Sequence, residues 1–118
     1  MAATKFVAIV GSDEPQRIFP AFILALGARA LDMDAVLFFT MSGLRGLVKG
    51  EAEKIELAGN SLAGMLQQAE ELGVRLLACS TALEAMGVSA DSLVEGTEIV
   101  GVATYLTEAA DNAVVNTF

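Results

Sequence analysis

Residues 74–79 read Val-Arg-Leu-Leu-Ala-Cys, and residues 80–87 read Ser-Thr-Ala-Leu-Glu-Ala-Met-Gly. The first run is mostly apolar and has the length of a strand, whereas the second run favours a short helix. Cys79 is therefore predicted to lie where a strand ends and a helix begins. The first N–H groups of a helix lack partners within it and the helix dipole is positive there, so this position favours a thiolate.

Cys79 is the only cysteine in a chain that has no histidine. Without histidine, the usual general base and the commonest metal ligand are both missing, and we expect no metal site and no cofactor. Any chemistry that the protein performs alone is predicted to pass through the Cys79 sulfur. The amides near Thr81 and Ala82 are predicted to stabilise its thiolate. A second interpretation stays open, in which the cysteine is a small buried hydrophobic residue.

Apolar runs of strand length alternate with helical patterns along the chain, which predicts a single α/β domain over residues 1–118. A continuously apolar run such as 6–10 is typical of a strand buried on both faces of a parallel sheet. With right-handed crossovers, the pattern predicts a three-layer α/β/α fold around a five-stranded, mainly parallel sheet. The predicted strands are 6–10, 35–40, 74–79, 98–102 and 113–118, and the predicted helices are one with Pro15 in its first turn, then 62–72, 80–87 and 104–112.

The segment 41–60 contains four glycines, too many for one uninterrupted helix. It superficially suggests a phosphate-binding loop, but Lys49 precedes a glycine and an acid follows, so nucleotide binding is not predicted. Leu44, Leu47 and Val48 are instead interpreted as an exposed apolar patch that contacts a partner or another subunit.

Four of the seven cations follow the carboxyl ends of predicted strands, on the edge where parallel sheets bind ligands. They are Arg17, Arg45, Lys49 and Lys54. Arg45 and Lys49 are the candidate substrate-binding cations, because a positive field would lower the thiol pKa and attract an anionic donor such as a persulfide or thiosulfate. The alternative is a solvated loop in which these cations pair with nearby acids, namely Glu51, Glu53 and Glu56.

The composition narrows the classes of partner. A net charge of −8 argues against nucleic acid or an anionic membrane as the main partner. No apolar run has the roughly 20 residues that a membrane-spanning helix needs. A single unpaired cysteine fits a reducing compartment, so we expect a cytoplasmic protein. The hydrophobic content of 54% predicts extensive burial, part of it in subunit contacts.

Three segments of the chain resemble the DsrE/DsrF-like family, particularly its short single-domain members. They are Phe-Phe-Thr-Met-Ser-Gly-Leu at 38–44, Leu-Leu-Ala-Cys-Ser-Thr-Ala-Leu-Glu-Ala-Met-Gly-Val at 76–88, and Gly-Val-Ala-Thr-Tyr-Leu at 101–106. The resemblance implies a five-stranded, mainly parallel sheet and homo-oligomers such as trimers or hexamers. It also implies that Cys79 accepts sulfane sulfur or thiosulfate and passes it to another carrier, commonly a TusA-like protein.

The leading hypothesis is thus a cytoplasmic, homo-oligomeric sulfur carrier or sulfurtransferase that acts through Cys79. Some members of the family have a second cysteine nearby and this chain does not, which leaves a simple relay through a persulfide or S-thiosulfonate. A second hypothesis is a non-catalytic binding or assembly subunit, with Cys79 in the core and segment 41–60 as its docking surface. A third is a small-ligand pocket at the sheet edge without covalent chemistry.

Overall fold

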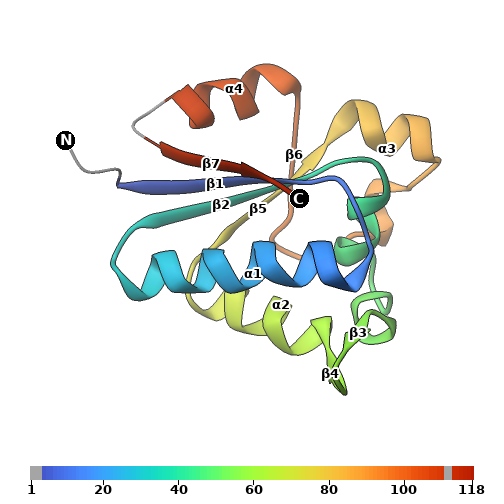
Figure 1. Cartoon of the computed structure of the whole chain (residues 1–118). Coiled ribbons are helices and arrows are strands. Elements are labelled where there is room, and N and C mark those ends of the chain that lie inside the picture. Colours follow the sequence, from blue (N-terminus) through green and yellow to red (C-terminus); the bar gives the residue numbers. More distant parts are fainter. Residues whose placement is uncertain (1–3, 111–112) are drawn as a thin grey trace.

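The computed structural model describes residues 4–110 and 113–118, which form an α/β fold around a five-stranded parallel sheet (Figure 1). Every neighbouring pair of its strands is parallel, in the order β6-β5-β2-β1-β7. The sheet strands are β1 (Lys5–Val10), β2 (Asp34–Phe39), β5 (Arg75–Cys79), β6 (Glu98–Val100) and β7 (Ala113–Thr117). The predicted fold class is confirmed, because each predicted strand is present in the predicted sequence order.

The helices form layers on both sides of the sheet (Figure 1). On one face lie α1 (Pro15–Ala30) and α2 (Leu62–Glu71), and on the other lies α4 (Val102–Ala110). The short α3 (Ser80–Met86) continues outward from the carboxyl end of β5. Among the helices of the described ranges, none is both long and apolar enough to cross a bilayer.

The central strand β2 packs against both layers through neighbouring aromatic residues. Phe39 contacts Phe22 of α1, with ring centroids 5.8 Å apart. Phe38 contacts Tyr105 of α4, with ring centroids 4.7 Å apart. Because successive side chains of a strand point to opposite faces, this pair of phenylalanines joins α1 and α4 to the same strand.

Charged side chains fasten α4 at the amino end of the sheet. Lys5, which is only 8% exposed, places its Nζ 3.3 Å from Glu108 Oε2. Arg75 binds the same Glu108 and also Glu98, 3.2 Å away. The hydrogen bonding that Arg75 donates to the Glu98 carboxylate is the main reason that the pKa of Arg75 is raised. These cations begin their strands, so they lie at the edge of the sheet opposite Cys79.

The last strand–helix junction lies earlier than predicted. Strand β6 ends at Val100, and α4 begins at Val102 instead of residue 104. The Gly101 carbonyl accepts hydrogen bonds from the N–H groups of Thr104 and Tyr105, so the first helical turn is already closed before residue 104. The predicted end of this helix, Asn112, lies outside the described residues.

The segment after β2 contains short helices and strands and is not an irregular loop. The prediction of an exposed apolar patch in this segment is wrong. It forms the short 3-10 helices η1 (Met41–Leu47) and η2 (Ala52–Lys54) and the hairpin strands β3 (Glu56–Leu57) and β4 (Asn60–Ser61). Leu44 and Leu47 are 1% and 0% exposed, and Val48 is partly buried. Residues three apart eclipse each other in a 3-10 helix, so the two leucines share the face that packs on the sheet.

Two glycines allow η1 to approach the core this closely. A Cβ on Gly43 would lie 2.0 Å from the Val10 carbonyl oxygen, and a Cβ on Gly46 would lie 2.8 Å from Cδ1 of Ile18. The glycine content that argued against one long helix therefore serves close packing against the carboxyl end of β1.

We predict that Gly43→Ala lowers the free energy of unfolding by about 3 kcal/mol, because a methyl group there overlaps a backbone oxygen that cannot move independently. Urea denaturation measures the change. Gly64→Ala is the matched control, since Gly64 is an exposed residue of α2 and a Cβ there meets nothing within 4 Å. The control is expected to gain about 0.5–1 kcal/mol from helix propensity. Equal stability of the two variants contradicts the close approach of η1.

Candidate functional site

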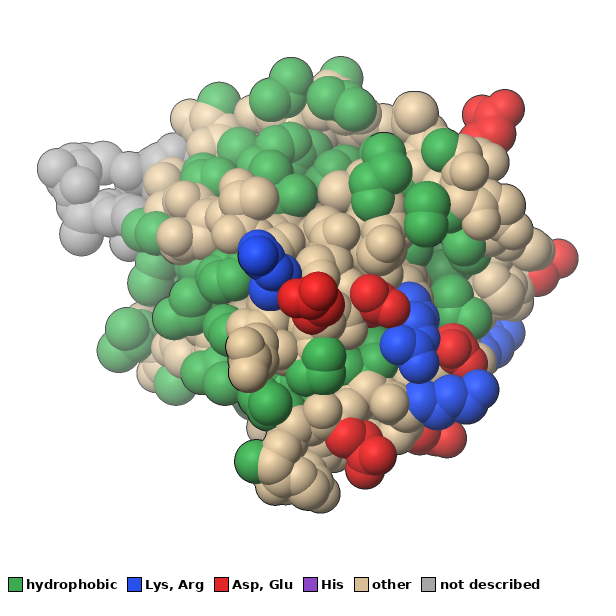
Figure 2. Space-filling model, turned by 45° about the vertical axis from the view of Figure 1, so that its right-hand side comes forward, with side chains coloured by type: hydrophobic (Ala, Val, Ile, Leu, Met, Phe, Trp, Pro, Cys, Tyr) green, Lys and Arg blue, Asp and Glu red, His purple; other side chains and the backbone are tan. Residues whose placement is uncertain are grey.

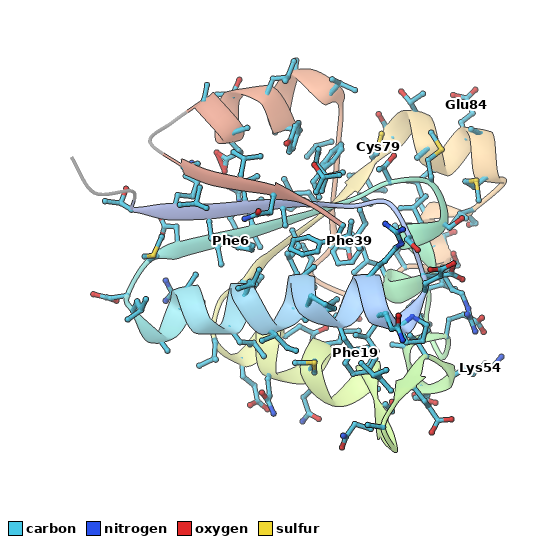
Figure 3. The ribbon with its side chains drawn as sticks, viewed as in Figure 1. Phe6, Phe19, Phe39, Lys54, Cys79 and Glu84 are labelled. Atoms are coloured by element: carbon cyan, nitrogen blue, oxygen red, sulfur yellow. The ribbon has the colours of Figure 1, made fainter. Side chains whose placement is uncertain are left out.

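Cys79 is the last residue of β5 and the residue that precedes α3, as predicted (Figure 3). It is a free cysteine, 5% exposed, and lies in register with Val100 of β6. Its side chain is on the α4 face of the sheet, because Phe38 pairs with Leu77 and Cys79 is two residues further along β5. The structure therefore places the thiol at the carboxyl edge of the sheet, where parallel α/β sheets bind ligands, and buries it there.

The first turn of α3 presents the amides that were predicted to stabilise a thiolate. Thr81 is exposed and Ala82 is fully buried. The Cys79 side chain forms no capping hydrogen bond with this helix. N–H groups in the first turn of a helix have no partner within it, so the amides of Thr81 and Ala82 are donors close in sequence to the sulfur. Their role toward a substrate stays a prediction.

A cavity of 360 Å³ opens at the carboxyl edge of the sheet, at the far end of α3 from Cys79. Its wall combines η1 with the end of α3, through Met41, Leu44, Met86 and Val88. Cys79 does not line it. A helix of this length separates its two ends by about 10 Å, so thiol and cavity are distinct features of the same edge.

Arg45 lines this cavity, with its charge already matched by acids. Its guanidinium lies 3.2 Å from Asp13 Oδ2 and 3.0 Å from Glu51 Oε1. Glu51 also binds Lys54, at 2.7 Å. The hydrogen bonds that Arg45 donates to Glu51 and then to Asp13 raise the pKa of Arg45. Those that Glu51 accepts from Lys54 and then from Arg45 lower the pKa of Glu51. The structure thus favours the paired-loop alternative over an uncompensated positive field.

The other predicted cations of this edge are not gathered around the thiol. Lys49 donates from its Nζ to the Asp91 carbonyl oxygen at 3.2 Å and does not line the cavity. Arg17 pairs with Glu14 at 3.5 Å on the surface. Figure 2 shows basic and acidic side chains adjacent to one another on this side of the molecule. Arg45 is thus the one candidate substrate-binding cation that reaches the cavity.

The cavity is also lined by two methionines, which the sequence patterns did not single out. Met41 and Met86 are each 47% exposed. Met41 also has φ of 47°, in the left-handed region that long side chains rarely adopt. Its place two residues after the end of β2, at the carboxyl edge, is the signal that could have marked it.

Comparison with known proteins gives a consistent family match. The model of the DsrE/DsrF-like family matches residues 4–117. Uncharacterized protein YrkE of Bacillus subtilis strain 168 is 25% identical over 146 residues, covering 90% of this chain and 91% of that protein.

Two solved structures share the fold. The ychN protein from E. coli superposes with a TM-score of 0.77 and 22% identity, covering 97% of this chain and 99% of the other. MTH1491 from Methanobacterium thermoautotrophicum, titled a protein of unknown function, superposes with a TM-score of 0.72 and 21% identity, over 97% and 98% of the two chains.

We predict that Glu51→Gln lowers the urea midpoint at pH 7, because it removes the carboxylate that Lys54 and Arg45 share. A carboxyl with a lowered folded-state pKa stabilises the protein above its unfolded pKa of about 4.3, and this contribution is lost as pH falls through the folded value. The difference between variant and wild type should therefore narrow below about pH 4. Glu53→Gln, at an exposed neighbour, is the control. A difference that is independent of pH contradicts the ion-pair role.

Proposed function

Because the chain belongs to the DsrE/DsrF-like family, we propose that it is a sulfur carrier or sulfurtransferase-like protein that relays sulfane sulfur or thiosulfate through Cys79. The observation that carries the proposal is the position of its only thiol, at the carboxyl end of β5 and directly before α3. Ligands of parallel α/β sheets bind at this edge. In this family such a cysteine would be nucleophile and carrier in one.

The proposed sulfur transfer balances in atoms and electrons with thiosulfate or tetrathionate as the donor. The Cys79 thiolate attacks the sulfane sulfur of thiosulfate, an S–S bond forms, and sulfite leaves with the electron pair of the broken bond. With tetrathionate, the thiolate takes up an S-thiosulfonate group and thiosulfate leaves. In the second half-reaction an acceptor thiolate attacks the outer sulfur of the persulfide, which restores the Cys79 thiolate. A TusA-like carrier protein is the proposed acceptor.

Burial of the thiol sets the expected kinetics. At 5% exposure the sulfur meets a donor only when its cover opens locally. The reaction should therefore be slower than that of a free thiol. The proposed stabilisers of the thiolate are the amides of Thr81 and Ala82, which follow Cys79 closely in the chain. The proposed compartment is the cytoplasm, where the reducing conditions keep a lone thiol reduced.

The proposal includes self-assembly, as a trimer or hexamer of identical chains. Its support is the apolar surface of the described residues: Ile99, Val102 and Leu106 are 46%, 52% and 57% exposed at and after β6. Large exposed apolar residues in one region of a surface mark contacts with other chains.

We predict that incubation with polysulfide or tetrathionate adds sulfur or a thiosulfate group to the intact protein, as read by mass spectrometry. The adduct should be removed by dithiothreitol and be absent from Cys79→Ser. If Cys79 stays unmodified in the folded protein but reacts in urea, the carrier function is rejected.

Arg45 and Lys49 are the proposed electrostatic helpers, and the structure distinguishes them. Arg45→Gln is expected to slow adduct formation with tetrathionate about twofold, the scale of an exposed and partly neutralised charge. Lys49→Gln, whose side chain is bound to the Asp91 carbonyl, serves as the matched control and should change the rate less. Mass spectrometry of samples quenched at successive times gives the rate of adduct formation for both variants. A larger effect of Lys49→Gln contradicts this assignment.

Burial of Cys79 favours a second candidate function, a non-catalytic binding or assembly subunit in which this residue belongs to the core. Leu44 and Leu47 cannot be its docking surface, because both are buried. This candidate predicts that Cys79→Ala keeps the native sedimentation coefficient and partner binding, while the wild-type thiol stays unreactive until the protein unfolds.

A further inference from the structure

Strand β7 forms one edge of the sheet and is unusually open for an edge strand. It pairs with β1, and within the described residues no further strand lies beside it (Figure 1). Its sequence, Ala-Val-Val-Asn-Thr, carries no charge and no proline. Val114 and Val115, which point to opposite faces, are 44% and 42% exposed. Edge strands usually carry a charge or a proline that blocks further pairing, and this one does not.

The direction of its free hydrogen-bonding groups follows from the end of the chain. The N–H of Phe118 donates to Ile9 O at 2.7 Å, and Phe118 O accepts from Gly11 N at 2.8 Å. Both groups of Phe118 therefore face β1. Because directions alternate along a strand, Val114 and Asn116 also face β1. The N–H and C=O groups of Ala113, Val115 and Thr117 point outward.

These outward groups are symmetric about Val115. If a second β7 lies antiparallel with Val115 opposite its own copy, Ala113 lies opposite Thr117 on both sides of the centre. Residues opposite one another in such positions exchange both N–H···O bonds, so every outward group of β7 finds a partner. We propose that two copies of this chain pair through β7 around a two-fold axis at Val115, joining their sheets into one continuous sheet.

Charge supports a second copy as the occupant of this edge. Each chain carries a net charge of −8, so two copies repel wherever charged surfaces meet. The uncharged β7 offers a line of contact without that repulsion, and the pairing also covers Val114 and Val115. The opposite edge strand, β6, is only three residues long and carries Glu98, which is bound to Arg75. That edge lacks the same self-complementarity.

On the face that α1 covers, the helix layer leaves room for the second strand, whereas α4 lies on the other face and contacts β7 itself. Helix α1 packs against β1 and β2, not mainly against β7. A two-fold axis perpendicular to the sheet keeps α1 and its copy on the same face, each over its own inner strands. The interface is isologous, so it closes as a dimer and can also serve as the two-fold contact of a larger ring assembly.

A symmetric disulfide tests the register. In a hydrogen-bonded antiparallel pair the opposing Cα atoms are about 5.5 Å apart, within the range of about 4.4–6.8 Å that a disulfide spans. In a Cys79→Ser background, Val115→Cys treated with diamide is expected to give mostly covalent dimer, because each new thiol faces its own copy and diamide accepts the two electrons.

Val114→Cys is the matched control, with almost the same exposure one residue away. Its two copies are diagonal neighbours about 7–8 Å apart, too far for a disulfide, so at least tenfold less cross-linking is expected. Leu31→Cys, 76% exposed just after α1, reports random collision. Equal cross-linking of Val114→Cys and Val115→Cys overturns the proposed register.

A second variant tests the hydrogen bonds without a disulfide. Val115→Pro removes an N–H that points away from β1, so the strand keeps its bonds within the sheet. Sedimentation velocity should show at least tenfold weaker association than for wild type. Because this inference deepens the proposed self-assembly, the outcomes separate the two. If the wild type is oligomeric but Val115→Cys forms no cross-link, the proposed self-assembly stands and the β7 contact is rejected. If the wild type is monomeric, both are rejected.

Discussion

The three layers depend on one pair of adjacent residues in the central strand. Phe38 and Phe39 point to opposite faces of β2, and each contacts an aromatic ring of a different layer, Tyr105 of α4 and Phe22 of α1. Since β2 lies between β1 and β5, this pairing holds both helices over the strands that end at the candidate site. The ion pairs of Glu108 with Lys5 and Arg75 hold the later part of α4 at the amino end of the sheet.

The carboxyl edge separates two chemical environments that are adjacent in most reactive cysteine sites. The thiol lies at one end of α3, under the α4 face, and the cavity with Arg45 lies at the other end. The charge of Arg45 is matched by Asp13 and Glu51. Activation of the thiol in the proposed relay therefore depends mainly on the backbone of α3 and on local opening, with only a small contribution from Arg45.

Large apolar side chains are exposed at both edges of the sheet. The exposed large apolar residues include Val114 and Val115 of β7, Ile99 of β6, and Val102 and Leu106 of α4. Helix α4 follows β6 and precedes β7 in the chain, and it lies on the side of the sheet toward which Cys79 points. The proposed contacts between chains thus adjoin the helix layer on the side of the sheet that holds the thiol.

The order of strands and helices, the parallel sheet and the position of Cys79 were all determined by the sequence, because continuous apolar runs and helix-forming segments are local patterns. The start of α4 was displaced by two residues, since the Gly101 carbonyl closes the first turn before the strand pattern ends. Leu44 and Leu47 looked exposed in a glycine-rich segment. Only the tertiary structure shows that those glycines let η1 approach Val10 closely enough to bury them.

The electrostatics were likewise decided in three dimensions. The sequence placed Arg45 on the correct edge, but whether its charge is free depends on Asp13, 32 residues earlier in the chain, which the fold brings to 3.2 Å. Burial of Cys79 is equally nonlocal, because its neighbour in register, Val100, belongs to β6, a later element of the chain that the fold places beside β5. Local pattern determined which residues form the strands, the helices and their junctions, and long-range packing decided which side chains are covered, paired or open to a partner.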